Sequence, residues 1–247
     1  MSRLGAVLGV VAWCAVARAG TVFDNLVTRD ITVHSLAANG QPGGMELGNS
    51  ITLAGHERAV TRMDVAMAIG GSGPAQFDAT LRLYANDGPN ATPGTLLWAG
   101  TRSLVIDSGA DVVYSFTLPG VVVPTSLTWT MQASNRTGNQ SAFGLPHYMP
   151  PAMGSVAPGY WMGSAGSWTP GFGVHPFGAR IIATVVCSAD FDHDGDTGTD
   201  ADIEAFFRCL AGDCCSTCGT ADFDQDGDTG TDADIEAFFR VLAGGVC

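Results

Sequence analysis

Apolar and polar residues alternate along short segments in the first three quarters of the chain. In the segment 77–84, Ala79, Leu81 and Leu83 fall on one face, and polar or charged residues fall on the other. The segment 126–132 repeats the pattern with Leu, Trp and Met on one face. Because successive side chains of a strand point to opposite faces, this period of two predicts half-buried β-strands.

Similar segments recur between turns rich in Gly, Pro, Asn and Asp. They are 50–54, 59–69, 95–98, 103–106, 112–118 and 177–186. No stretch before residue 187 has a helical period. Closely spaced strands joined by such turns predict one antiparallel β-sandwich or jelly roll over residues 20–186, in a chain that is mainly β.

The pattern changes after residue 186, where one unit occurs twice, at 189–212 and 221–244. The copies differ only at His193/Gln225 and Cys209/Val241. Each contains an apolar i, i+3, i+4, i+7 series, which predicts an amphipathic helix. The series are Ile203, Phe206, Phe207 and Leu210, then Ile235, Phe238, Phe239 and Leu242. Packed face to face, two such helices predict a small α-helical domain over 187–247.

Each helix has local start and stop signals. Thr199 is a good N-cap, with Asp202 three residues later, and Gly212 is a natural C-terminal cap. The acidic residues in the first turn suit the helix dipole.

Before each helix, Asp occupies alternate positions and a Gly stands at the sixth. EF-hand loops use this D-x-D-x-D-G opening to place oxygen ligands around calcium, and the Gly permits the sharp turn. The predicted ligands are Asp190, Asp192, Asp194, Asp196 and Asp202, then Asp222, Asp224, Asp226, Asp228 and Asp234. The sequence therefore predicts two calcium ions, each held by half an EF-hand, since no helix precedes either loop.

The closing ligand departs from the EF-hand pattern. Counted from Asp190, the twelfth residue is Ala201, and Asp202 follows it. A one-residue insertion around 197–198 would make Asp202 and Asp234 the closing ligands. Asp200 and Asp232 are the second choice.

Charge is concentrated in the same region. Residues 187–247 contain 13 Asp, 2 Glu and 2 Arg, which equals the net charge of -13 of the whole chain. So dense a negative charge favours bound cations, and it argues against nucleic acid or an anionic membrane as a partner.

The first 19 residues predict a secretory signal peptide, and hence a secreted or cell-surface protein. Arg3 precedes an apolar run over 4–16, and Ala17-Arg18-Ala19 fits a cleavage site. The run is too short for a membrane span, and no later stretch approaches that length.

Six cysteines remain after the leader: Cys187, Cys209, Cys214, Cys215, Cys218 and Cys247. An even number in an exported chain indicates disulfides. We expect Cys187 and Cys247, which bracket the repeats, to form a clasp, while the other four pair among themselves. A zinc site at Cys215-x-x-Cys218 is the rival interpretation.

The doubled loop–helix unit, with its Gly-Thr-Asp-Ala-Asp-Ile-Glu-Ala-Phe-Phe sequence and flanking cysteines, resembles a Cys-containing, planctomycete-type dockerin domain over 187–247. Dockerins bind cohesin modules through their helices when calcium is present. The resemblance implies a cohesin-like or other surface protein as partner. It also implies two binding orientations, and a recognition surface near Thr199, Asp200, Thr231 and Asp232. The alternative is that calcium only stabilises the fold.

The sequence of the first domain favours no catalytic activity, although the question stays open. Glu46 and Glu57 are its only Glu, and neither a G-x-S-x-G elbow nor an H-E-x-x-H motif occurs. We expect a non-catalytic sandwich, with a polysaccharide-active or carbohydrate-binding protein as the alternative. The aromatic residues of 147–177 would form either core or a sugar platform: Tyr148, Tyr160, Trp161, Trp168, Phe172 and Phe177.

Overall fold

The computed structural model describes residues 19–35, 45–55, 57–70, 74–107, 111–138, 142–164, 167–173 and 175–245. Contacts divide these residues into two compact units, which meet in sequence between Val186 and Cys187. Residues 1–18, most of the expected signal peptide, lie outside the described part. No described helix is both long and apolar enough to cross a membrane.

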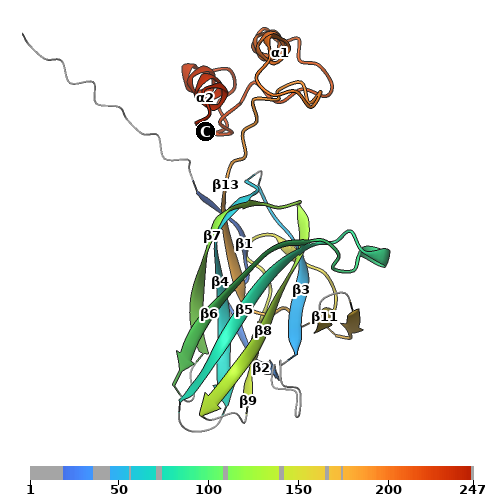
Figure 1. Cartoon of the computed structure of the whole chain (residues 1–247), viewed down its shortest axis with the longest axis vertical. Coiled ribbons are helices and arrows are strands. Elements are labelled where there is room, and N and C mark those ends of the chain that lie inside the picture. The colour runs from blue at the N-terminus through green and yellow to red at the C-terminus, as the bar shows by residue number, and fades with distance from the viewer. Residues whose placement is uncertain are drawn as a thin grey trace, which may run out of the picture. The chain divides into compact units, whose positions relative to one another are not determined.

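The first unit is an antiparallel β-sandwich, which confirms the prediction from the alternating pattern (Figure 1). Its first sheet has the order β1-β13-β4-β9-β2, with β7 also paired to β4. The strands are β1 (Gly20–Asp24), β2 (Arg29–Ser35), β4 (Ala59–Gly70), β7 (Asp111–Val122), β9 (Ala142–Tyr148) and β13 (Ala179–Thr184). β4 pairs with β7 over residues 59–68, with β13 over residues 59–65 and with β9 over residues 68–70.

The second sheet has the order β12-β11-β3-β8-β5-β6, with β10 also paired to β3. The strands are β3 (Glu46–Thr52), β5 (Ala75–Ala85), β6 (Leu96–Ile106), β8 (Ser126–Gly138), β10 (Ser155–Val156), β11 (Tyr160–Ser164) and β12 (Ser167–Gly171). A short 3₁₀ turn, η1 (Pro89–Ala91), lies between β5 and β6.

The sandwich core forms where the inward faces of the two sheets meet. Ala79, Leu81 and Leu83 of β5 are fully buried, as their alternation predicted. On β8 the outward-facing Thr128 and Thr130 are fully buried as well. The alternating pattern did not predict this burial, because side chains from other strands cover the outer face of β8.

The predicted strands 95–98 and 103–106 are one strand, β6. The apolar pattern lapses between them, at Gly100 and its neighbours. β6 nevertheless pairs with β5 from Leu96 to Ile106. Backbone hydrogen bonds to β5 therefore keep the segment around Gly100 in a β-strand, although its side chains do not predict one.

The second unit contains the two predicted helices, α1 (Asp200–Leu210) and α2 (Asp232–Leu242). Thr199 caps α1 as expected, in a capping box with Asp202. Gly212 follows the end of α1 with a φ of +87°, a conformation that favours Gly at this position.

The core of the second unit differs from the predicted apolar stripe. Phe206 and Phe238 are fully buried, but Phe207 and Phe239 are 44% and 45% exposed. The loop residues Phe191 and Phe223 are buried instead, against the helical rings. Each helix thus contributes one ring to the core, and each loop contributes another.

Candidate metal centre

The backbone of each Asp-rich loop curls so that alternate side chains converge. In the first loop the N–H of Asp194 donates to Asp192 Oδ1 at 3.1 Å, and the N–H of Asp196 donates to Asp194 Oδ1 at 2.9 Å. These are Asx turns, in which a carboxylate accepts from the backbone two residues later. Gly195 has a φ of +97°, which side-chain-bearing residues rarely adopt. The second loop repeats these turns.

Carboxylates gather in both loops. Oxygens of Asp190, Asp192 and Asp194 lie within 4.8 Å of one another. In the second loop the corresponding group is Asp222, Asp224 and Asp234. The remaining predicted ligands Asp196 and Asp228, with the second choices Asp200 and Asp232, are outside these groups and exposed, and Asp202 and Asp226 also lie outside them.

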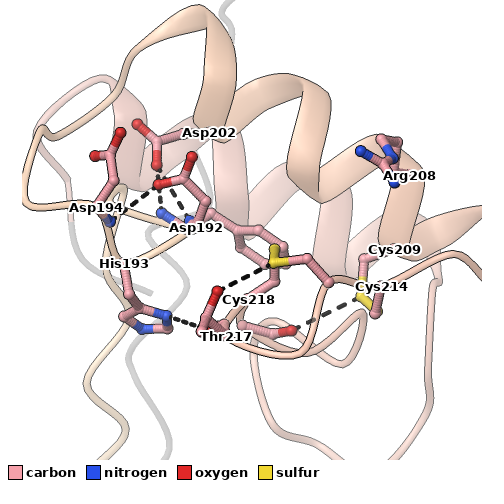
Figure 2. Close-up of a disulfide and its surroundings, with 12 residues drawn as sticks. Asp192, His193, Asp194, Asp202, Arg208, Cys209, Cys214, Thr217 and Cys218 are labelled. Atoms are coloured by element: carbon pink, nitrogen blue, oxygen red, sulfur yellow. Dashed lines mark hydrogen bonds between the residues drawn. A yellow bond between two sulfur atoms is a disulfide. The ribbon is translucent and has the colours of Figure 1, made fainter.

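Asp202, the predicted closing ligand, is fully buried and bonds to both ends of its loop (Figure 2). Its Oδ1 accepts from the N–H of Phe191 at 2.6 Å, and its Oδ2 accepts from the N–H of Thr199 at 2.8 Å. Asp234 makes the equivalent bonds to Phe223 and Thr231. The closing Asp therefore holds the first residues of the loop against the start of the helix.

Two carboxylate oxygens at these sites have no hydrogen-bond partner. Oδ1 of Asp190 and Oδ1 of Asp222 are both buried from solvent, and no described residue donates to either. They occupy equivalent positions in the two copies. A buried charged acceptor without a partner is costly, so the same cost arises twice unless a cation sits beside each oxygen.

The pKa shifts of the loop carboxylates also favour a bound cation. Burial raises the pKa of Asp224, and repulsion from Asp226, Asp234 and Asp222 raises it further, although the backbone N–H of Asp226 opposes this. For Asp202, burial raises the pKa, but backbone N–H groups of Thr199 and Phe191 outweigh it and leave the pKa below its ordinary value. The loop carboxylates therefore repel one another, whereas the closing carboxylate is stabilised as an anion.

The connecting segment 213–220 explains both differences between the copies. Cys209, which replaces Val241, forms a disulfide with Cys214. His193, which replaces Gln225, places its Nδ1 2.5 Å from the carbonyl oxygen of Thr217 (Figure 2). No equivalent segment follows α2 within the described residues. The copies therefore differ at the two positions where the first contacts segment 213–220.

The disulfides match the expected grouping of the four inner cysteines. Cys209 bonds to Cys214, and Cys215 bonds to Cys218. Because Cys215 and Cys218 are joined, their thiolates are not available to zinc. The expected partner of Cys187, Cys247, lies outside the described residues.

Within the second unit, the two copies of the repeat pack against each other in an equivalent way. A Cβ added at Gly198 in the first loop would lie 3.2 Å from Leu242 of α2, and one added at Gly230 would lie 3.3 Å from Leu210 of α1. Each loop thus closes against the helix of the other copy. The exposed rings of Phe207 and Phe239 also meet across this arrangement, with centroids 6.2 Å apart.

No protein-family model matches the chain, and no curated protein matches it. Among solved structures, "Structure of infectious bursal disease virus Gx strain" is 17% identical, with a TM-score of 0.28 over 74% of this chain and 45% of that chain. "The 2.6A structure of Infectious Bursal Virus Derived T=1 Particles" is 14% identical, with a TM-score of 0.28 over 75% and 44%. The chain thus spans less than half the length of these viral chains. At such TM-scores the likeness carries no implication for this protein.

Proposed function

We propose that residues 187–247 bind two calcium ions and that the calcium-bound unit docks onto a partner protein, so that a secreted or surface protein presents its β-sandwich there. The observation that carries this proposal is the pair of buried, unpartnered oxygens on Asp190 and Asp222. The donor set fits the ion, because calcium is a hard cation that prefers several carboxylate oxygens.

In the first loop, Asp190, Asp192 and Asp194 would hold the ion, and in the second loop Asp222, Asp224 and Asp234 would do so. A bound cation would neutralise the repulsion among these carboxylates. It would also fix the loop that carries Phe191 or Phe223 into the core. Calcium binding would thereby stabilise the whole unit, since an ion that binds only the folded state adds its binding free energy to folding.

The exposed helical face provides the candidate docking surface. Asp200 and Phe207 lie seven residues apart on α1, so they share one face of the helix, and Asp232 and Phe239 are placed in the same way on α2. The other phenylalanines of this unit are buried, which leaves this aromatic pair as its large exposed apolar group among the described side chains. Exposed aromatic side chains ringed by polar groups are typical of protein-binding surfaces.

Calorimetric titration of the full chain with calcium tests the metal sites. We expect two ions per chain for the wild type, one for Asp190→Asn, one for Asp222→Asn and none for the double variant. Asp213→Asn is the matched control, because Asp213 is exposed, pairs with Arg208 outside the loops and should leave two ions bound. A wild type that takes up no calcium at millimolar concentration contradicts the proposal.

The docking step needs a separate experiment. The immobilised full chain should retain one partner from extracts of the source cells with calcium, and release it with a chelator. Phe207→Ser together with Phe239→Ser should abolish capture without changing the calcium stoichiometry. If a partner binds equally well to this double variant or in chelator, the docking surface is wrong, even where calcium binds.

A further inference from the structure

The β-sandwich contains a cavity that the calcium-binding unit does not explain. It has a volume of about 280 Å³, near the lower end of the range for small-molecule sites, about 300–1,000 Å³. None of its twelve lining residues carries a charged side chain. The lining combines aromatic rings, prolines, hydroxyls and amides, which suits a neutral ligand with both apolar faces and polar edges.

A chain of hydrogen bonds fixes the polar wall of this cavity. The indole N–H of Trp161 on β11 donates to Ser50 Oγ on β3 at 2.9 Å, and Ser50 Oγ lies 2.7 Å from Thr128 Oγ1 on β8. Thr128 in turn donates to Asn86 Oδ1 at 2.6 Å, and Asn86 Nδ2 donates to Ser126 Oγ at 3.0 Å. Side chains from four segments are thereby held in place before any ligand arrives.

The direction of these bonds shows what the wall can offer. Because Thr128 donates its hydrogen to Asn86, the hydroxyl of Ser50 must donate to Thr128. The hydroxyl of Ser126 accepts from Asn86, which leaves its own hydrogen to be donated. Asn86 likewise keeps one amide hydrogen. The wall therefore presents a hydroxyl donor and an amide donor at fixed positions.

The backbone around the cavity is already paired, which disfavours a peptide ligand. The N–H of Ala157 donates to the carbonyl of Ser50 at 2.9 Å, and the N–H of Gly159 donates to the carbonyl of Gly173 at 3.0 Å. The carbonyl of Gly159 accepts from Asn49 Nδ2 at 3.1 Å. A peptide that adds to a sheet needs free backbone groups, so recognition here falls to side chains.

The rim adds a second observation. Asn90 and Ala91 are consecutive, exposed residues with φ of 56° and 57°. Two neighbouring residues other than Gly in this region are unusual, and such strain concentrates at ligand-binding sites. The turn is closed by paired bonds between Gly88 and Thr92 and between Thr92 and Pro89. These bonds hold the turn that carries Asn90, an exposed residue that lines the cavity.

We propose that this cavity binds a neutral carbohydrate. Sugar rings present apolar C–H faces that stack on aromatic side chains, and uncharged hydroxyls that pair with amides and hydroxyls. Trp161 supplies the apolar contact, and Asn86, Asn90 and Ser126 pair with the sugar hydroxyls. The site is independent of the Asp-rich loops, and it would let the sandwich hold a polysaccharide while the second unit docks elsewhere.

Calorimetry with the full chain tests the site against a panel of neutral hexaoses: β-1,4-glucan, β-1,3-glucan, β-1,4-xylan, β-1,4-mannan and α-1,4-glucan. We expect at least one to bind with a dissociation constant below about 1 mM. Trp161→Ala should weaken that binding by about tenfold or more, since a central Trp contributes strongly to binding. Asn90→Gly should weaken it severalfold, because Gly tolerates the φ of 56° and only the amide is lost.

Trp168→Ala is the matched control. Trp168 lies on the same hairpin, but packs on Tyr84 with ring centroids 5.3 Å apart and does not line the cavity, so sugar binding should persist. Chelation of calcium should leave the affinity unchanged, which separates this site from the docking proposal. The proposal is overturned if no panel member binds at millimolar concentration, or if Asn90→Gly and a folded Trp161→Ala both bind as the wild type does.

Discussion

The ring of Phe206 stacks on the ring of Phe238, with centroids 4.1 Å apart and planes inclined by 20°. These residues occupy equivalent positions in the two copies of the repeat, so the contact joins the two helices of the second unit. Phe191 and Phe223 from the loops pack edge-on against the same pair. A unit of this size depends heavily on such a cluster, because its core is small.

Neighbouring phenylalanines should therefore differ sharply in their effect on stability. Phe206→Ala should lower the free energy of unfolding of the second unit by about 3–5 kcal/mol, or leave that unit unfolded, since it empties the centre of the core. Phe207→Ala should change it by less than about 1 kcal/mol, because that ring is 44% exposed. Urea denaturation followed by helical circular dichroism measures both, and equal losses would contradict the observed packing.

Asp202 should stabilise the folded second unit even in the absence of calcium. Asp202→Asn keeps the shape of the side chain but replaces an oxygen that accepts from Thr199 with an amide that cannot accept. In a chelating buffer we expect a loss of about 1–3 kcal/mol in the free energy of unfolding. Asp200→Asn, which changes an exposed carboxylate in the same turn, is the control and should have little effect. A loss seen only with calcium present would mean that Asp202 acts as a ligand alone.

The Cys209–Cys214 disulfide should stabilise the end of the first helix. Cys209→Val with Cys214→Ser removes it and introduces the residue found at the equivalent Val241. For so short a loop, we expect the free energy of unfolding to fall by about 2 kcal/mol, from the added freedom of the unfolded chain. Thermal melts in oxidising buffer measure the loss. A reductant should destabilise the wild type further than it destabilises the variant, and an identical response would argue against this pairing.

Asp78 provides a pH test within the sandwich. Hydrogen bonds from the hydroxyl of Ser103 and from the amide of Asn135 hold the pKa of this carboxyl below its ordinary value. Because the folded-state pKa is the lower one, its contribution to stability is present above the unfolded pKa of about 3.9 and is lost as the pH falls through the folded value. Ser103→Ala should move the pKa of Asp78 upward in a carboxyl NMR titration. Gln76→Ala, at an exposed position on the same strand, should not move it.

Short-range patterns in the sequence predicted the fold class of the first unit and the two helices of the second. The period of two along β5 and β8 predicted the strands and their inward faces, and the residues around Thr199 predicted the start of α1. Of the five carboxylates that the alternating Asp pattern predicted as ligands in the first loop, the structure brings together Asp190, Asp192 and Asp194. These features depend on backbone geometry within a few residues, so the local sequence is enough to specify them.

Only the tertiary structure decided which side chains are buried, paired or left without a partner. The burial of Thr128, which is hydrogen-bonded to Ser50 and Asn86, depends on residues far away in the chain, and the exposure of Phe207 was not visible in its apolar series. The disulfide pairing and the cavity beside Trp161 depend on such contacts as well. A periodic pattern shows that a face is apolar, but not which segment covers it. That is decided when distant segments meet and compete for the same surface.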